Sequence, residues 1–240
     1  MTARLAAHGL CRRFGPTHAV EDVGLVVDPG QVHALVGLNG AGKTTLMRLL
    51  LGMLRPDHGG ISIGGVALGG LPAERWARVG HLIETPFAYP ELSVRANLTM
   101  AAQLRLVDRH QIPATVDQAI SELELGAYAH VLSRRLSQGN RQRLGLAAAL
   151  QHHPELIVLD EPSSSLDPAG VILLREAILR RRDAGAGILV SSHHLDEVAR
   201  IADRITVMNH GRLIGTLDPR TPDLERAFFH AVHADDEGRR

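Results

Sequence analysis

Three short apolar blocks in this sequence each end abruptly in polar residues. They occupy residues 32–36, 156–159 and 188–190. Short, nearly continuous apolar runs are typical of strands that are buried in a parallel sheet. Because ligands bind beyond the carboxyl ends of the strands in such a sheet, we expect the three polar ends to meet at one site.

Helical stretches separate these blocks. The spacing of apolar residues predicts helices over 44–54, 141–151 and 170–182. Strand and helix therefore alternate, which indicates an α/β fold with a parallel sheet.

Two regions depart from this alternation. The first thirty residues contain short apolar segments and turns at 14–16 and 28–30, and residues 59–70 are rich in glycine and alternate. Both regions predict an antiparallel sheet. Residues from about 90 to 153 are mostly helical and separate the first polar end from the second. The simplest interpretation is an inserted helical subdomain.

The composition limits the classes of protein to which this chain can belong. The 26 Lys and Arg residues balance the 26 Asp and Glu residues, and 45% of residues are hydrophobic, which is ordinary for a globular protein and excludes a generally cationic surface. Cys11 is the only cysteine, so an intrachain disulfide and a cysteine-based zinc cluster are excluded. We find no apolar run of membrane-spanning length and no export signal, and therefore expect a cytoplasmic chain.

The first polar end is a glycine-rich loop. Residues 37–44 match the phosphate-binding pattern G-x-x-x-x-G-K-[ST] between a predicted strand and a predicted helix. The glycines let backbone N–H groups surround phosphate oxygens, Lys43 places a compact cation on the β- and γ-phosphates, and the Thr44 hydroxyl is a candidate Mg²⁺ ligand. Lys43 is also the only lysine in the chain, which indicates that arginine does not serve at this position.

The second polar end carries two adjacent acids, Asp160 and Glu161. Neighbouring side chains on a strand point in opposite directions, so one acid can reach the magnesium shell while the other faces a reacting water. We assign Asp160 to the metal and Glu161 to the general base that polarises water for attack on the γ-phosphate.

With these motifs in place, the chain resembles the ATP-binding subunits of ATP-binding cassette (ABC) transporters from residue 5 to about 216. The most specific element is Leu-Ser-Gln-Gly-Asn-Arg-Gln-Arg at 136–143, which is similar to the LSGGQ signature of that family. The resemblance implies a P-loop NTPase ABC cassette with a parallel RecA-like sheet core, an N-terminal antiparallel β subdomain and an inserted α-helical subdomain. The whole chain is then a single ABC ATP-binding domain, with a core at 1–86 and 154–218, a helical signature subdomain at 87–153 and a C-terminal extension at 219–240.

The resemblance also implies roles for individual residues. ATP and Mg²⁺ are the expected cofactors, and Lys43, Glu161 and His193 are the expected catalytic residues, with His193 contacting the γ-phosphate. The residues expected to bind ATP are Phe14, Asn39, Gly40, Ala41, Gly42, Lys43, Thr44 and Thr45. Phe14 would stack on adenine, although a lone phenylalanine is more often a core residue.

The same resemblance implies partners. Ser137 and Gly139 of the signature would contact the ATP held by another cassette in a head-to-tail dimer, and Asp167 would lie in the D-loop that crosses the dimer interface. Whether the chain forms a homodimer or a heterodimer stays open. The expected partner is a transmembrane permease subunit that holds the chain at the inner face of the membrane, without nucleic acid.

Two residues depart from the pattern of the family. Gln138 replaces the first signature glycine, and Glu84 stands where the family has the Q-loop glutamine. A glutamate adds a negative charge beside the phosphates, so we expect Glu84 to join Thr44 and Asp160 at the metal. The form of this loop is similar to the branch with bacitracin-resistance and lantibiotic-immunity exporters. Residues 84–100 are the candidate surface for docking a permease, unless Phe87, Tyr89 and Leu92 are core residues of the subdomain.

Two other function classes stay open beside a transporter ATPase. One is a soluble ABC ATPase that acts on nucleic acid, which the neutral charge and the short chain disfavour. The other is a regulator that binds ATP with little turnover, which the departures at Gln138 and Glu84 allow. Arg180–Arg182 is the one local basic cluster and is interpreted as a solvated helix end. His152, His153 and His194 lack metal-ligand spacing and are interpreted as structural or solvated.

Overall fold

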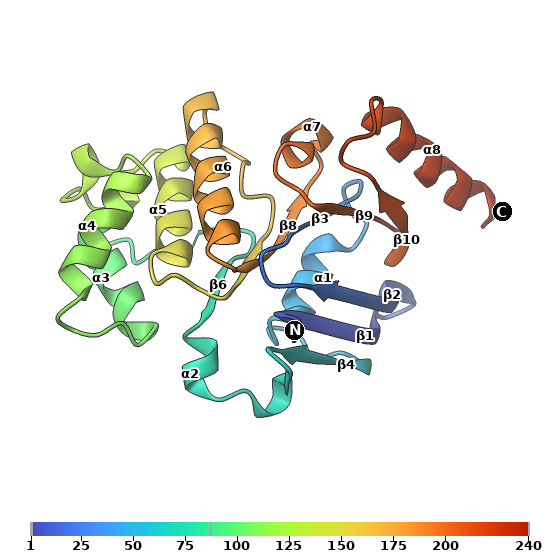
Figure 1. Cartoon of the computed structure of the whole chain (residues 1–240), viewed down its shortest axis with the longest axis horizontal. Helices are drawn as coiled ribbons and strands as arrows, with labels where there is room; N and C mark the ends of the chain where they lie inside the picture. The colour runs from blue at the N-terminus through green and yellow to red at the C-terminus, as the bar shows by residue number, and fades with distance from the viewer. Residues whose placement is uncertain (1, 87, 240) are drawn as a thin grey trace.

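The structure is a computed structural model that describes residues 2–86 and 88–239. Its main sheet has six strands in the order β10-β9-β3-β8-β7-β6 (Figure 1). The strands are β3 (Val32–Val36), β6 (Val79–Leu82), β7 (Leu156–Leu159), β8 (Gly187–Ser192), β9 (Arg204–Asn209) and β10 (Arg212–Leu217). The pairs from β6 to β9 are parallel and only β10 runs antiparallel to its neighbour. Every residue of β3, β7 and β8 is buried, as their continuous apolar sequences predict.

A second sheet is antiparallel and has the strand order β2-β1-β4-β5. Its strands are β1 (Leu5–Phe14), β2 (Thr17–Val27), β4 (His58–Ile63) and β5 (Val66–Ala67). Helix α1 (Lys43–Leu50) lies between the two sheets. Leu46 of α1 packs in one buried cluster with Leu5 of β1 and Leu189 of β8. Because this cluster joins both sheets, the phosphate-binding loop at the start of α1 has a rigid support.

Six further helices pack against the other face of the main sheet in a second buried cluster. They are α3 (Val94–Leu104), α4 (Ile112–Glu122), α5 (Gln138–Leu150), α6 (Pro168–Asp183), α7 (Leu195–Ala199) and α8 (Leu224–Glu237). Short helices occur at α2 (Ala73–Trp76), η1 (Leu68–Gly70), η2 (Gly126–Tyr128) and η3 (Ser133–Arg135). Figure 1 places α3, α4 and α5 at the end of the molecule opposite to α8 and the C-terminus.

The helices differ from their expected ranges at their ends. Ser137 and Asp167 accept hydrogen bonds as N-caps, so α5 and α6 begin earlier than the apolar spacing predicts. Helix α1 ends at Leu50, four residues before the expected end, and Gly52 then adopts a φ of 68°. Among the described residues, no helix is both long enough and apolar enough to span a membrane.

The interpretation of Arg180–Arg182 as a solvated helix end is wrong for Arg181. This residue is buried, and its Nη2 donates to Oε2 of Glu122 on α4 at 2.7 Å, while Nη2 of Arg180 donates to Oε1 of the same glutamate at 2.7 Å. Burial raises the pKa of Glu122, but the hydrogen bonds and charges of Arg181 and Arg180 outweigh it and hold that pKa below its usual value. Arg180 and Arg181 therefore join α6 to α4, and only Arg181 of the three arginines is buried.

Candidate functional site

The polar ends of β3, β7 and β8 meet at one pocket of about 480 Å³. Residues 39–45 of the glycine-rich loop line it together with Glu161, Ser164 and His193. The other lining residues are Thr17, His18, Ala19, His210 and Gly211. The expectation that the three strand ends converge is confirmed by this shared pocket, since neighbouring parallel strands carry their ends to the same edge.

The loop backbone has a shape that only glycine permits at two positions. Gly42 has a φ of 106°, and a Cβ atom there would lie 2.4 Å from the carbonyl oxygen of Ala19. A Cβ at Gly37 would lie 2.4 Å from the carbonyl oxygen of Met208. Gly42 is also the N-cap of α1 and contributes no side-chain hydrogen bond, so the first N–H groups of α1 are left for an anion.

The ammonium group of Lys43 lies inside the loop. Nζ donates to the carbonyl oxygen of Gly37 at 2.7 Å and to that of Leu38 at 3.3 Å, and it lies 3.5 Å from Oε1 of Glu161. Only 6% of Lys43 is exposed. The lysine therefore joins the phosphate-binding loop to the acidic end of β7 in a space that leaves little room for the larger guanidinium of an arginine.

The two adjacent acids after β7 point to different partners. Asp160 is buried, and its carboxylate accepts hydrogen bonds from Thr44 Oγ1 at 2.7 Å and from Ser191 Oγ at 2.5 Å. Glu161 adopts a φ of 47°, and its backbone N–H donates to Ser191 Oγ at 2.9 Å. Ser191 thus contacts both acids, a role that its place at a polar strand end did not indicate. In the sequence, this contact could have been expected from the serine at the end of β8, because β8 is the parallel neighbour of β7, which carries the two acids.

Glu161 lies between two basic side chains. Its Oε2 is 2.5 Å from Nδ1 of His193, a hydrogen bond in which the ring N–H donates to the carboxylate when the proton is on Nδ1, and its Oε1 faces Lys43. His193 is partly exposed, and its ring centroid lies 3.9 Å from that of His194. A carboxylate held in this way at the mouth of a phosphate-binding loop is placed to accept a proton from water.

The residues expected to bind Mg²⁺ fall into two groups. The Thr44 hydroxyl and the Asp160 carboxylate are in direct contact, and oxygen ligands of this kind, few in number, suit an ion that also binds substrate phosphates. Glu84 instead forms an ion pair with Arg48 of α1 and does not line the pocket. A role of Glu84 at the metal therefore stays a prediction, and it requires the release of Arg48.

Phe14 lies at the end of β1, before the turn to Thr17, and 47% of it is exposed. The guanidinium carbon of Arg12 lies 4.9 Å from the centre of its ring. It is not among the described residues that line the pocket, and the lining residue nearest to it along the chain is Thr17. Exposure contradicts the alternative that Phe14 is a core residue, and adenine stacking stays a prediction.

The signature lies next to the D-loop at 164–167; Ser137, Gly139 and Asp167 do not line this pocket, whereas Ser164 of the D-loop does. Ser137 caps α5 by accepting from the Asn140 N–H at 3.2 Å, and a Cβ atom at Gly139 would lie 2.9 Å from the carbonyl oxygen of Ser165. Asp167 caps α6, and hydrogen bonds from Arg143 and from the Gly170 N–H hold its pKa below the usual value.

Two residues that the sequence motifs did not indicate connect the signature helix to the site. Gln142 donates from Nε2 to the carbonyl oxygen of Pro162 at 2.9 Å, directly after Glu161, and Arg143 donates from Nη2 to Asp167 at 2.6 Å. Both belong to the stretch 142–147 of α5, in which every residue is buried, and polar residues beside the apolar run that follows them are the signal that could have identified them. The first half of α5 is thereby attached to the segment that follows Glu161.

The segment before α3 is held by Asn97. This buried amide donates from Nδ2 to the carbonyl oxygens of Tyr89, Leu92 and Ser93 at 3.0–3.2 Å and accepts from the Tyr89 N–H at 2.8 Å. The Tyr89 residue is 40% exposed and Leu92 is partly exposed, whereas Phe87 lies outside the described residues. In the described part of the candidate docking surface, the loop before α3 therefore has a defined conformation, with Tyr89 exposed and Leu92 partly exposed.

Comparisons with known proteins agree with this geometry. The family model of the ABC transporter matches residues 20–164. The bacitracin transport ATP-binding protein BcrA of Bacillus licheniformis is 33% identical over 215 residues, which cover 89% of this chain and 69% of that protein. The spermidine/putrescine import ATP-binding protein PotA of Pseudomonas aeruginosa is 35% identical over 215 residues, which cover 87% of this chain and 58% of that protein.

Structure comparison gives the same family. A solved ATP-binding subunit of an ABC transporter matches with a TM-score of 0.84 and 30% identity, over 95% of this chain and 94% of that chain. The expected α/β cassette fold, with its parallel and antiparallel sheets, is confirmed by this match. Relatives of different transport systems are similarly close, so the branch of the family is not distinguished by identity. The chain belongs to the ABC transporter family and is an ATP-binding subunit of that family of ATPases.

Proposed function

We propose that this chain hydrolyses ATP as one half of a cassette dimer and drives a separate transmembrane permease that exports antibiotic or peptide-type compounds. The observation that carries the proposal is the placement of Lys43, Glu161 and His193 around one pocket of about 480 Å³, beside the Thr44–Asp160 pair. These residues supply the cation, the base and the metal-binding oxygens that phosphoryl transfer to water requires.

The residues divide the chemistry between them. Lys43 and the N–H groups at the start of α1 bind the phosphates and orient the γ-phosphate toward Glu161. Glu161 accepts the proton of the attacking water at its carboxylate, while His193 holds that carboxylate in position. Thr44 and Asp160 would hold Mg²⁺, which would supply positive charge beside the phosphate oxygens.

The proposed dimer follows from the separation of two groups that can bind an anion, the phosphate-binding loop at the start of α1 and the signature at the start of α5. Ser137 and the Gly139 N–H lie outside the pocket of their own chain, at the start of α5, and Ser137 is exposed. A second cassette placed head to tail would bring these groups to the ATP of its partner. Homodimers and heterodimers both satisfy this arrangement.

Export and the permease contact rest on residues 84–100. The Ile-Glu-x-Pro form of this loop supports the bacitracin-type branch, and BcrA is among the similar proteins, although the import protein PotA is similar too. The exposed loop held by Asn97 is the proposed docking surface, and binding there would place the chain at the inner face of the membrane. Attachment to the membrane would come from the permease, since no helix among the described residues is long and apolar enough to span a membrane.

The test is steady-state ATP hydrolysis with Mg²⁺ by wild-type protein and by Glu161→Gln, with size-exclusion chromatography of both in ATP. We expect turnover in the wild type, a loss of about a hundredfold or more in the variant, and an ATP-dependent dimer of the variant. Glu74→Gln, which changes an exposed acid on α2, is the matched control and should behave as wild type.

Two outcomes would redirect the proposal. Equal turnover of the wild type and Glu161→Gln would overturn the role of Glu161. If the chain binds ATP tightly with a permease bound, but neither hydrolyses ATP nor forms a dimer, the result would favour the alternative that it is a regulator with little turnover.

A further inference from the structure

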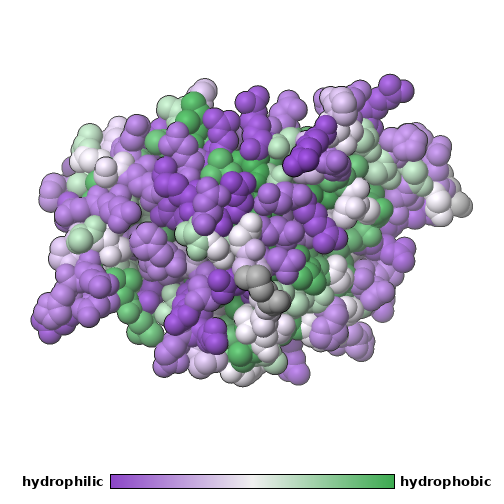
Figure 2. All heavy atoms as spheres, in the orientation of Figure 1, coloured by the Kyte–Doolittle hydropathy of each residue, from purple (hydrophilic) through white to green (hydrophobic). Residues whose placement is uncertain are grey.

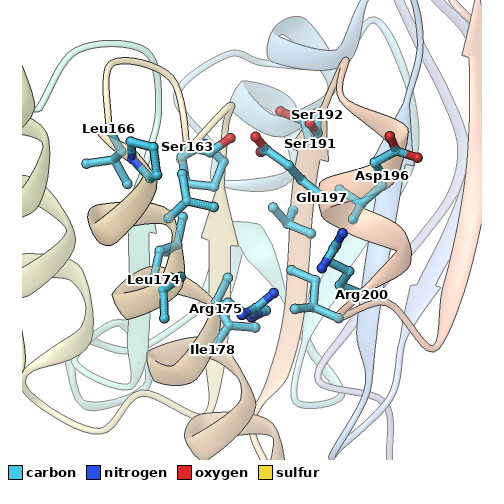
Figure 3. A pocket seen from close by; sticks show the side chains of 17 residues that line it. Ser163, Leu166, Leu174, Arg175, Ile178, Ser191, Ser192, Asp196, Glu197 and Arg200 are labelled. Atoms are coloured by element: carbon cyan, nitrogen blue, oxygen red, sulfur yellow. The ribbon is translucent and has the colours of Figure 1, made fainter.

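A second pocket of about 550 Å³ lies between α6 and α7 (Figure 3). It shares no described lining residue with the phosphate-loop pocket, and no step proposed above uses it. Its size is within the range of pockets that hold small organic ligands. Figure 2 shows hydrophobic residues at the surface between these helices, where the surrounding surface is mostly hydrophilic.

One wall of the α6–α7 pocket is apolar. Leu174 and Ile178 of α6 face Val198 and Ile201 from the α7 side, and all four residues are buried. Branched side chains fixed in the core form a preformed surface, so an apolar chain can pack on them without reorganising the protein.

Two arginines lie on the same pocket without partners. Figure 3 shows the guanidinium groups of Arg175 on α6 and Arg200 after α7 pointing toward one another across the cavity. Within residues 2–86 and 88–239, neither group forms an ion pair or a hydrogen bond. By contrast, Arg180 and Arg181 of the same helix both bind Glu122. Two facing cations with no carboxylate between them repel each other, and an anion that binds both would relieve this repulsion.

The pocket also contains acids that restrict the ligand. Asp196 and Glu197 lie at the start of α7, and Figure 3 shows both on the side of the pocket away from Arg175. These carboxylates oppose a second negative charge on the ligand. The arrangement therefore favours a single carboxylate at the arginine end and an uncharged chain along the apolar wall.

The position of the pocket connects it to the catalytic acids. Pro162 and Ser191 line it, Pro162 directly follows Glu161, and the Ser191 hydroxyl contacts Asp160 and the Glu161 N–H. A molecule in the pocket would contact the backs of the two segments that hold these carboxylates.

We propose that the α6–α7 pocket binds an amphipathic monocarboxylate through Arg175 and Arg200, and that the bound molecule changes the rate of ATP hydrolysis through Ser191 and Pro162. The second half of this proposal rests on the ATPase function proposed above, whereas the first half does not.

The binding test uses octanoate and isothermal titration calorimetry with the full chain in the absence of nucleotide. We expect saturable binding at one site and a weakening of about tenfold or more in Arg175→Gln/Arg200→Gln. The matched control Arg109→Gln/Arg220→Gln removes two charges from exposed positions outside the pocket and should bind as wild type. Octan-1-ol and the dicarboxylate suberate should both bind wild type more weakly than octanoate does.

A second pair of variants tests the apolar wall. Ile172 lines the pocket and is 47% exposed, and Phe229 on α8 is 51% exposed and lies outside it. Both substitutions to glutamate are at partly exposed sites, so folding should persist. Ile172→Glu should abolish octanoate binding and Phe229→Glu should not. Absence of saturable binding, or equal binding by the two arginine double variants, would overturn the proposed site.

The turnover test adds octanoate to the wild type during ATP hydrolysis. We expect the rate to change by about fivefold at saturation and to stay constant in Arg175→Gln/Arg200→Gln. Octanoate that binds with the expected residue dependence but leaves turnover unchanged would overturn the proposed effect on the catalytic acids. Because calorimetry needs no nucleotide, failure of the site is distinguishable from failure of the ATPase proposal.

Discussion

Ser191 shows how one hydroxyl organises the acidic end of β7. It donates to the buried carboxylate of Asp160 and accepts from the backbone N–H of Glu161, which keeps the two neighbouring acids in different directions. The Glu161 backbone adopts a positive φ, a conformation that costs free energy for a residue with a side chain. The hydrogen bond from Glu161 N–H to Ser191 compensates part of this cost.

At Ser191 we therefore predict a loss of both stability and activity. Ser191→Ala should lower the free energy of unfolding by about 1–3 kcal/mol because it leaves a buried carboxylate with one fewer donor. It should also lower ATP turnover by about tenfold, since Glu161 loses its support. Urea denaturation and an ATPase assay measure the two effects. Ser163→Ala, next to the acidic segment but without contact to either carboxylate, should change neither.

The Arg48–Glu84 ion pair supports a prediction about magnesium. If the Glu84 carboxylate joins the metal once Arg48 releases it, Glu84→Gln should raise the Mg²⁺ concentration needed for half-maximal turnover, whereas Arg48→Gln should lower it. Both shifts should exceed the change in ATP affinity. Two unchanged magnesium titrations would leave Glu84 as a structural partner of Arg48.

At the scale of elements, α6 is attached to α4 by a buried charge cluster. Arg181 and Glu122 have side chains that are 7% and 9% exposed, so removing either charge leaves the other in a poorly solvated place. The apolar spacing of the sequence located α4 and α6 approximately, but it could not show that one arginine of a basic run points inward. Side-chain direction at the end of a helix depends on which helix packs against it.

Glu122→Gln should therefore destabilise the fold by about 3 kcal/mol, because Arg181 keeps its charge and loses its carboxylate. The measurement is the midpoint of urea unfolding with an unchanged slope. Glu176→Gln removes an acid that pairs with Arg180 at 3.6 Å on the exposed face of α6, and should cost less than about 0.5 kcal/mol. Equal effects of both variants would show that burial of the cluster contributes nothing.

At the scale of the molecule, two largely buried histidines, each still partly exposed, lie where the helical region meets the main sheet. His81 on β6 lies 3.0 Å from Arg105 at the end of α3, and His152 follows α5. Burial, assisted by the charge of Arg105, lowers the pKa of His81 to about 4 and that of His152 to about 3. Both rings are thus neutral in the folded chain at neutral pH.

These pKa values predict a loss of stability in mild acid. In the unfolded chain both histidines have a pKa near 6.5. Between pH 6.5 and about pH 4 the unfolded chain therefore binds more protons than the folded chain, and the free energy of unfolding falls as the pH falls. Between pH 7 and pH 5 the loss should be about 1–2 kcal/mol per histidine. The pKa of Glu122 is held below its ordinary value of 4.5, so this residue changes the stability only below about that pH and contributes nothing between pH 7 and pH 5.

The measurement is urea unfolding at pH 7 and pH 5. His152→Gln should reduce the difference between the two pH values, while His110→Gln, on an exposed loop, should leave it unchanged. An equal difference in wild type and His152→Gln would contradict the assignment of the acid sensitivity to this histidine.

The sequence alone specified the parallel sheet, the antiparallel sheet and the residues at the strand ends. Continuous apolar strands must be buried on both faces, and a phosphate loop between a strand and a helix has few alternative conformations, so local pattern and spacing suffice for these features. Only the tertiary structure showed that Ser191 contacts both acids, that Glu84 binds Arg48 and that Arg181 is buried against Glu122. The same holds for the α6–α7 pocket, whose walls come from separate elements. These contacts join residues that are distant in the chain, and their geometry follows from how the helices and sheets pack, which no local pattern encodes.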